Sequence, residues 1–89
     1  MEEQKELFST RDLYLASALT TLGFMMESVD YQLEGTRTVG YFNFNATPEL
    51  KETEKKYWQG KLLVEPQAFI TGMRGLKARV SNQYNNPRY

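Results

Sequence analysis

The side chains best suited to chemistry in this chain are cationic and aromatic, because the residues on which most enzymes depend are missing. The 89 residues include neither histidine nor cysteine. The commonest general base, the commonest metal ligand and the thiolate nucleophile are therefore excluded. Ser9 has no histidine to activate it, and with Asp12 three residues later it fits a helix cap better than a nucleophile. We expect no enzymatic activity, no metal site and no bound cofactor.

The carboxylates do not combine into a site either. In an extended strand Glu27 and Asp30 point to opposite faces, so they are not a ready catalytic pair. Glu49 and Glu52 share a helix face, but no further ligand for a hard cation accompanies them. The chemistry that remains is binding.

Arg37 and Tyr41 mark a candidate binding site on an aromatic strand. Alternation along residues 37–44 places Phe42 and Phe44 on one face and Arg37 and Tyr41 on the other. If helices cover the phenylalanine face, the ring of Tyr41 could stack on a base while the guanidinium binds a phosphate. A strand with buried phenylalanines and a tyrosine at its wet edge explains the same pattern without a ligand. Both interpretations stay open.

The charge of the chain is unevenly distributed although its total is zero. Residues 1–60 carry a net charge of −4 and residues 61–89 a net charge of +4. Arg74, Lys77, Arg79 and Arg88 could form a basic strip that contacts phosphates. They could equally be a solvated helix face, with cations favoured near the C-terminus of the helix or paired with acidic surface.

A Gly-x-x-Gly sequence at residues 72–75 matches the motif that clamps nucleotides in KH domains, where it forms a loop between two helices. Here Met73 belongs to an apolar stripe with Phe69, Leu76 and Val80, which recur in phase across the motif. The stripe predicts one unbroken helix through both glycines.

Hydrophobic periodicity and turn residues predict the elements that position these side chains. Leucines form the stripe of a first helix, and Leu50, Tyr57 and Trp58 are expected on the buried side of a second. The expected ranges are a helix over 9–22, strands over 25–33 and 37–45, a helix over 47–59, a short strand or extended linker at 62–64, and a helix over 66–82.

We predict the α+β class with the element order α-β-β-α-(short β)-α, in which a small antiparallel hairpin sheet packs against helices. An isolated hairpin is marginal in water, so the first and last helices should cover its apolar face. A single domain is expected over residues 8–82. Residues 1–7 are expected to be disordered or poorly ordered, and residues 83–89 to form a flexible C-terminal tail.

The composition also favours one cellular location. No apolar run approaches the roughly 20 residues of a membrane span. Residues 1–7 are acidic and polar, unlike a signal peptide. The absence of cysteine fits a reducing compartment. We therefore expect a cytoplasmic protein.

Five segments carry a resemblance to a known family. They are FSTRDLYLA at 8–16, LGF at 22–24, an Arg-led strand ending in YFNF at 41–44, YWQGKL at 57–62 and LKAR at 76–79. The chain resembles, over residues 8–80, a small family of domains of unknown function found in bacteria and their phages. The resemblance implies a compact α/β unit in a prokaryotic or phage setting. If a phage encodes the chain, the protein would act in the host cytoplasm. The resemblance implies no activity. Gly72 and Gly75 depart from the helix formers expected there.

Two functions fit these observations. The first is a small non-enzymatic protein-interaction module of bacterial or phage origin, such as a phage accessory protein that acts on a host protein, with self-association as a further possibility. The alternative is a nucleic-acid-binding module. Its contacts would be Arg37, Tyr41, Arg74, Lys77 and Arg79.

Overall fold

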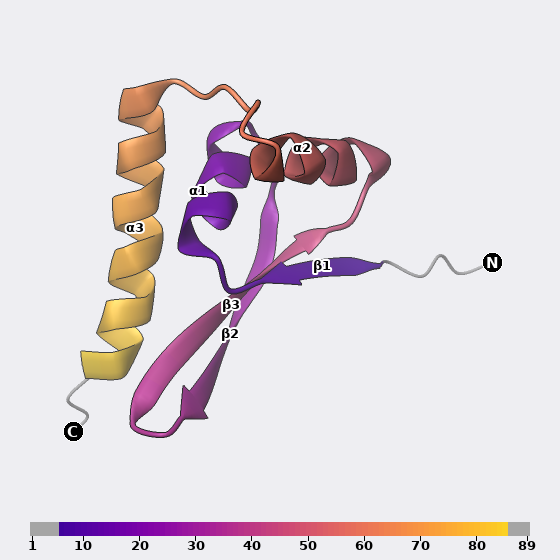
Figure 1. Ribbon diagram of the computed structural model, residues 1–89. Helices are drawn as coiled ribbons and strands as arrows, with labels where there is room; N and C mark the ends of the chain where they lie inside the picture. The colour runs from indigo at the N-terminus through magenta and orange to yellow at the C-terminus, as the bar shows by residue number, and fades with distance from the viewer. Residues whose placement is uncertain (1–5, 86–89) are drawn as a thin grey trace.

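The computed structural model describes residues 6–85, and the side chains of residues 6–81, as an arrangement of helices around a small sheet (Figure 1). In chain order the elements are β1 (Leu7–Thr10), α1 (Leu13–Thr21), β2 (Met26–Glu34), β3 (Arg37–Asn45), α2 (Pro48–Trp58) and α3 (Pro66–Asn85). The strands form an antiparallel sheet in the order β1-β3-β2. The α+β class predicted from the sequence is confirmed.

Strands β2 and β3 form the predicted hairpin. Gly35 lies in its turn with a φ of +67°, a backbone conformation that glycine adopts without the clash of a Cβ atom. Glu34 aligns with Arg37 beside the turn, and Asp30 aligns with Tyr41 further along. This register fixes which side chains share a face of the sheet.

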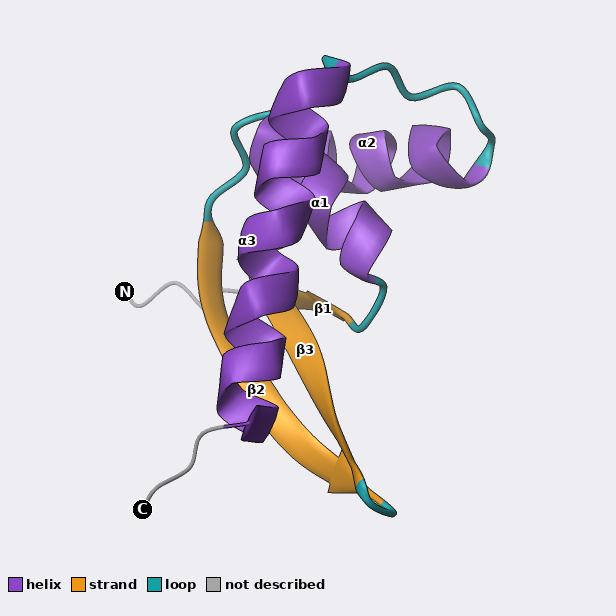
Figure 2. Ribbon diagram, turned by 90° about the vertical axis from the view of Figure 1, so that its left-hand side faces the viewer, coloured by secondary structure: helices purple, strands orange, loops and turns teal. Residues whose placement is uncertain are grey.

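The core lies between one face of the sheet and the helices. Phe42 and Phe44 of β3 are buried there, which stabilises the fold by roughly 1.5–3 kcal/mol for each side chain. The core that they share with the helices contains Leu15, Ala16 and Leu19 of α1, Leu50 of α2 and Leu76 of α3. Helix α1 lies between α2 and α3 (Figure 1), and α3 runs alongside the β2–β3 hairpin (Figure 2).

Strand β1 was not predicted. Its four residues pair with residues 42–45 of β3, and Phe8 aligns with Phe44. The ring of Phe8 packs against the core, while the hydroxyl of Ser9 donates a hydrogen bond to the Asn43 side chain on the other face. The prediction of Ser9 as a helix cap is therefore wrong, because Ser9 belongs to a strand whose partner lies far along the chain.

Asp12 is the residue that caps α1. Its carboxylate accepts hydrogen bonds from the backbone N–H groups of Tyr14 at 2.9 Å and Leu15 at 3.1 Å. Aspartate is as good an N-cap as serine, so either residue satisfied the sequence pattern. The hydroxyl oxygen of Thr10 accepts the N–H of Asp12 at 3.0 Å and holds the chain between β1 and α1. Helix α1 consequently begins at Leu13, later than predicted.

The segment between α2 and α3 contains no strand. Residues 59–65 connect the two helices in an irregular conformation, and the side chain of Leu63 is 86% exposed. The short strand at 62–64 is therefore wrong, and the alternative of a linker describes the segment. The third strand of the sheet is β1 instead.

Helix α3 continues through both glycines of the Gly-x-x-Gly sequence, which confirms the predicted unbroken helix. At Gly72 an added Cβ would lie 3.5 Å from the Thr21 hydroxyl of α1, an ordinary contact. At Gly75 an added Cβ would meet no atom within 4 Å. Of the two glycines, Gly72 thus packs closely against α1 and Gly75 does not.

The ends of the described chain differ slightly from the predicted boundaries. Leu7 opens β1, and residues 1–5 lie outside the described residues. Helix α3 includes residues 83–85 of the predicted tail, and residues 86–89 lie outside the described residues. Within the described part of the chain no helix is long and apolar enough to cross a membrane.

Candidate functional site

An aromatic surface formed by Tyr14, Tyr57 and Trp58 lies where the start of α1 meets the end of α2. Tyr14 is 56% exposed and Trp58 is 60% exposed, although both side chains are large and apolar. Tyr57 is half-buried and packs against the core. The rings of Tyr57 and Trp58 meet edge to face, with their centroids 4.9 Å apart. The Tyr57 ring is thus held by the core, and it supports the Trp58 ring, which faces solvent.

Asp12 connects the two helices at this surface. Besides capping α1, its carboxylate lies close enough to Tyr57 to affect the tyrosine hydroxyl. Burial raises the pKa of Tyr57, and the negative charge of Asp12 and a hydrogen bond to its carboxylate raise it further. The Tyr57 hydroxyl therefore remains protonated, and neutral, at physiological pH.

The exposure of Trp58 corrects a prediction. The sequence predicted Tyr57 and Trp58 together on the buried side of α2 with Leu50, but Leu50 is buried and Trp58 is exposed. Adjacent residues of a helix point about 100° apart, so both rings cannot face the same core. Leu50 and Tyr57 are seven residues apart and share a face. The helical period, applied strictly, would have identified Trp58 as a surface residue.

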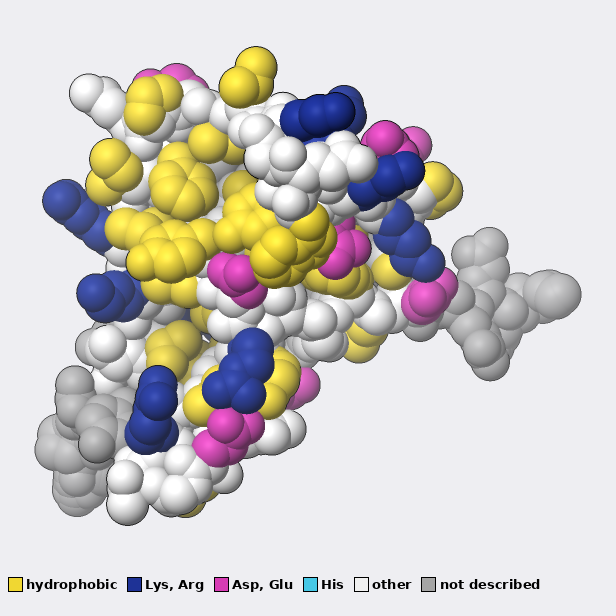
Figure 3. Space-filling model, viewed as in Figure 1, with side chains coloured by type: hydrophobic (Ala, Val, Ile, Leu, Met, Phe, Trp, Pro, Cys, Tyr) yellow, Lys and Arg dark blue, Asp and Glu magenta, His cyan; other side chains and the backbone are white. Residues whose placement is uncertain are grey.

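Apolar side chains also gather on the surface of the helices that carry these rings. Figure 3 shows hydrophobic side chains gathered over α1 and between α3 and α2, with charged side chains around them. Ile70 of α3 is also a large apolar side chain with substantial exposure. A contiguous apolar area on a small domain marks an interaction site more often than scattered apolar residues do.

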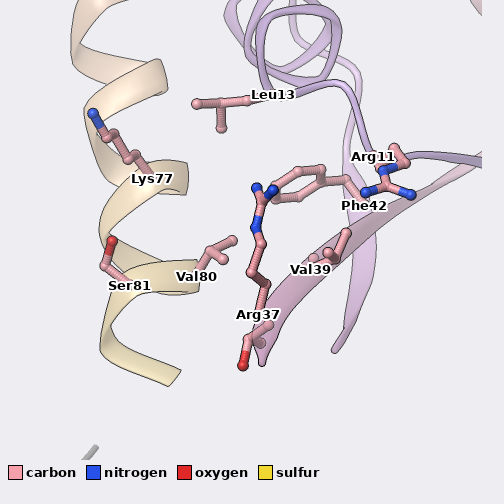
Figure 4. A pocket seen from close by; sticks show the side chains of 10 residues that line it. Arg11, Leu13, Arg37, Val39, Phe42, Lys77, Val80 and Ser81 are labelled. Carbon is pink, nitrogen blue, oxygen red and sulfur yellow. The ribbon is translucent and has the colours of Figure 1, made fainter. Parts of the chain in front are cut away.

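A second feature is a cationic groove between β3 and α3, with a volume of about 340 Å³ (Figure 4). It is lined by Arg11, Leu13, Arg37, Thr38, Val39, Gly40, Phe42, Lys77, Val80 and Ser81. The groove exists because β1 pairs with only residues 42–45 of β3, which leaves the edge of residues 37–41 without a neighbouring strand on that side. A second hollow, lined by Arg37, Thr38, Val80 and Ser81, adjoins it.

The cations that line the groove differ in whether an acidic side chain pairs with them. Arg11 forms an ion pair with Glu34 at 3.2 Å, and its guanidinium lies 5.7 Å from the centre of the Tyr41 ring. Neither Arg37 nor Lys77 forms an ion pair or a side-chain hydrogen bond with another described residue. Two cations in the groove are therefore without a counter-charge in the described part of the chain.

The structure brings together two of the five residues predicted as nucleic-acid or partner contacts. Arg37 and Lys77 line the same groove. Arg74 lies one turn before Lys77 on α3 and outside the groove lining, whereas Arg79 points about 200° away from Lys77 around the helix. Tyr41 does not line the groove, and its hydroxyl donates to Glu34 at 3.1 Å. The predicted strip is thus divided among several surfaces.

A polar network lies on the sheet face opposite the core, which we call the open face. Asn43 is only 3% exposed, and its amide donates hydrogen bonds to Ser28 and Asp30, each at 3.0 Å. Its carbonyl oxygen accepts a hydrogen bond from Ser9. The network joins all three strands, so β1, β2 and β3 are connected by side chains as well as by backbone hydrogen bonds.

Among residues 6–85, no group of three or more acidic side chains is placed to hold a metal ion. The family model described as "Domain of unknown function (DUF5659)" matches residues 5–82. No curated protein and no solved structure matches the chain. The family match confirms the resemblance to a family of unknown function, over nearly the span that the sequence motifs indicated.

Proposed function

The chain belongs to the DUF5659 family, and we propose that it acts by binding another protein through the aromatic surface. The observation that carries this proposal is the exposure of Tyr14 and Trp58, at 56% and 60%, beside the half-buried ring of Tyr57. Tyrosine and tryptophan are the side chains most enriched at the energetic centres of protein interfaces.

The geometry of the aromatic surface suits a binding role because its rings are largely preordered. Tyr57 packs against the core and holds Trp58 in edge-to-face contact, and the indole N–H of Trp58 donates to Glu54 at 3.0 Å. A side chain that is already ordered loses less conformational entropy when a partner covers it. The rings of the aromatic surface can therefore contribute a large apolar contact area while losing little conformational entropy.

The proposal includes no catalytic step, because the chain lacks histidine and cysteine and the sequence shows no acid–base constellation. It sets the interaction in the cytoplasm of a bacterium, or of the bacterial host if a phage encodes the chain. That setting rests on the resemblance of the sequence motifs. The partner is a second protein, and a second copy of the chain is one form that it can take.

Nucleic-acid binding is the weaker candidate. Arg37 and Lys77 share a groove, but Tyr41 stands beside the carboxylate of Glu34, which would repel a phosphate. Arg79 lies on another side of α3. Titration with oligonucleotides at low and high salt tests this candidate, since phosphate contacts weaken steeply as salt increases.

Affinity capture from cells that naturally produce the protein tests the proposed function. Three baits are compared: the wild type, Trp58→Ser, and Leu33→Ser as a matched control. Leu33 is a 74% exposed apolar residue at the hairpin end of β2, far along the chain from the aromatic surface. Each bait is checked for folding by circular dichroism.

We expect one protein to be recovered with the wild type and with Leu33→Ser, and recovery to fall at least about tenfold with Trp58→Ser, because central aromatic residues dominate binding energy. Sedimentation of the purified chain shows whether that partner is a second copy. Equal recovery with all three baits would contradict the proposal.

A further inference from the structure

We propose that the cationic groove binds a small organic anion, one with a carboxylate or phosphate head and a compact apolar body. This site is separate from the aromatic surface, and the inference does not depend on the proposed function. It rests on the charges that line the groove, on the apolar walls between them, and on the way the hairpin leaves Arg37 unpaired.

The lining of the groove carries one sign of charge. Three of its ten residues, Arg11, Arg37 and Lys77, are cationic and none is acidic. Glu34 neutralises Arg11, but Arg37 and Lys77 have no carboxylate among residues 6–81. An anion in the groove would thus meet two cations whose charges are not already balanced.

The pairing of the hairpin makes the free charge of Arg37 unexpected. Glu34 and Arg37 are direct cross-strand partners in the register, a position at which opposite charges normally pair. The carboxylate of Glu34 instead contacts the guanidinium of Arg11 at 3.2 Å and accepts the Tyr41 hydroxyl at 3.1 Å. Arg11 and Tyr41 thereby engage the carboxylate of the residue that is aligned with Arg37.

The direction of Arg37 then brings its charge into the groove. Figure 4 shows the side chain rising from the start of β3, between α3 and β3, toward the end of the groove where Leu13 and Phe42 lie. A guanidinium presents a planar fork of donors that matches a carboxylate or a phosphate. In the same view the ammonium of Lys77 points away from Arg37, outward along α3, and a rotation of its four-carbon stem would be needed to bring it over a bound anion.

The apolar side chains of the groove indicate the chemical nature of the part of the ligand that lies beyond its anionic head. Leu13, Val39, Phe42 and Val80 are apolar, and they line the groove together with the cations. At Gly40 an added Cβ would lie 2.9 Å from a methyl carbon of Val80, so α3 approaches the backbone of β3 directly there. A groove of about 340 Å³ is at the small end of ligand sites, which favours a compact body such as one aromatic ring.

Amide-detected NMR of the isotope-labelled full chain tests the inference with four probes. Phenyl phosphate and benzoate carry a ring and an anionic head, benzyl alcohol carries the ring without charge, and inorganic phosphate carries the charge without a ring. We expect phenyl phosphate or benzoate to shift the amides of residues 38–40 and 77–81. Whichever of the two binds more tightly identifies the head group. Benzyl alcohol and inorganic phosphate should each bind at least about tenfold more weakly, because each lacks one half of the recognised ligand.

Three variants separate the site from general surface charge. Arg37→Gln and Lys77→Gln lie on different elements, and each should weaken binding at least about tenfold, as expected for the loss of a charged hydrogen bond. Arg79→Gln is the matched control, because Arg79 is an exposed cation of the same helix that does not line the groove. Its affinity should equal that of the wild type.

Results of two kinds would overturn the inference. One is the absence of shifts at residues 38–40 and 77–81 with millimolar phenyl phosphate and benzoate, or shifts that all three variants leave unchanged. The other is a single-stranded oligothymidylate that shifts the same amides at a lower concentration than either small anion does, which would make the groove a nucleic-acid site.

Discussion

The open face of the sheet and the cationic groove differ in whether their polar side chains have partners within the chain. On the open face the buried amide of Asn43 is hydrogen-bonded to Ser9, Ser28 and Asp30. In the groove, Arg37 and Lys77 have no partner among the described residues. Hydrogen bonds that are complete within the chain stabilise its fold, whereas charges left unpaired are available to a ligand.

Arg11 lies between the two regions and shows how they are coupled. It lines the groove, yet its guanidinium is paired with Glu34 and rests against the ring of Tyr41. By occupying the carboxylate aligned with Arg37, it allows the groove to keep a free cation. Substitutions at these positions should therefore separate polar groups that stabilise the fold from those that are available to a ligand.

Replacing Asn43 with alanine should lower the free energy of unfolding by about 1–3 kcal/mol, because the change removes three hydrogen bonds at a buried position. Urea denaturation measures the loss. Gln32→Ala is the control, since Gln32 is an exposed residue of β2, and it should change stability by less than about 0.5 kcal/mol. Equal effects of the two substitutions on the free energy of unfolding would mean that the Asn43 network does not stabilise the fold.

Replacing Gly40 with alanine should lower the free energy of unfolding by about 1 kcal/mol, because the new methyl group would press on the stiff side chain of Val80 at 2.9 Å. Gly75→Ala is the matched contrast, with open space around the added atom. It should raise stability by about 0.5–1 kcal/mol through better helix propensity. Thermal unfolding of both variants checks the signs, and a stabilised Gly40→Ala would mean that α3 does not close on β3 there.

Replacing Glu34 with glutamine should lower the free energy of unfolding by about 0.2–1 kcal/mol, the range for a partly exposed ion pair. The loss should shrink at 1 M salt because salt screens exposed charges. Glu52→Gln is the control, since Glu52 is exposed and has no ion pair with a described residue. A loss that does not depend on salt would show that Glu34 acts through something other than its charge.

Replacing Arg37 or Lys77 with glutamine should change the free energy of unfolding by less than about 0.5 kcal/mol, the usual range for surface positions without partners. Chemical denaturation of each variant checks this. A loss above 1 kcal/mol for Arg37→Gln would mean that its guanidinium supports the fold, and the contrast with Asn43 would then fail.

The elements that the sequence predicted are those whose signals are local. The strands of the hairpin have a glycine turn between them, and α3 has a stripe that continues in phase through Gly72 and Gly75. Strand β1 has four residues, and its partner strand lies more than 30 positions along the chain. Such a short strand is defined by its partner rather than by its own pattern, so Ser9 was interpreted as a cap instead.

The surfaces were less predictable than the elements. Arg37 and Lys77 were identified as contact residues, but their shared groove depends on where β1 ends and on how closely α3 approaches Gly40. Tyr14 becomes a neighbour of Tyr57 through the packing of α1 against α2, which no local pattern specifies, whereas Trp58 follows Tyr57 directly in α2. The helical period of α2, applied strictly, would have shown that Trp58 cannot share the face of Leu50.

The most direct test of the account compares photo-crosslinking from two positions in living cells. A photoreactive phenylalanine analogue is placed at Tyr14 in one chain, on the aromatic surface, and at Gln32 in another, on exposed β2. The account predicts a discrete protein adduct from position 14 and none from position 32. An adduct from position 32 with none from position 14 would contradict it, because the partner would then bind the sheet whose polar groups are already paired.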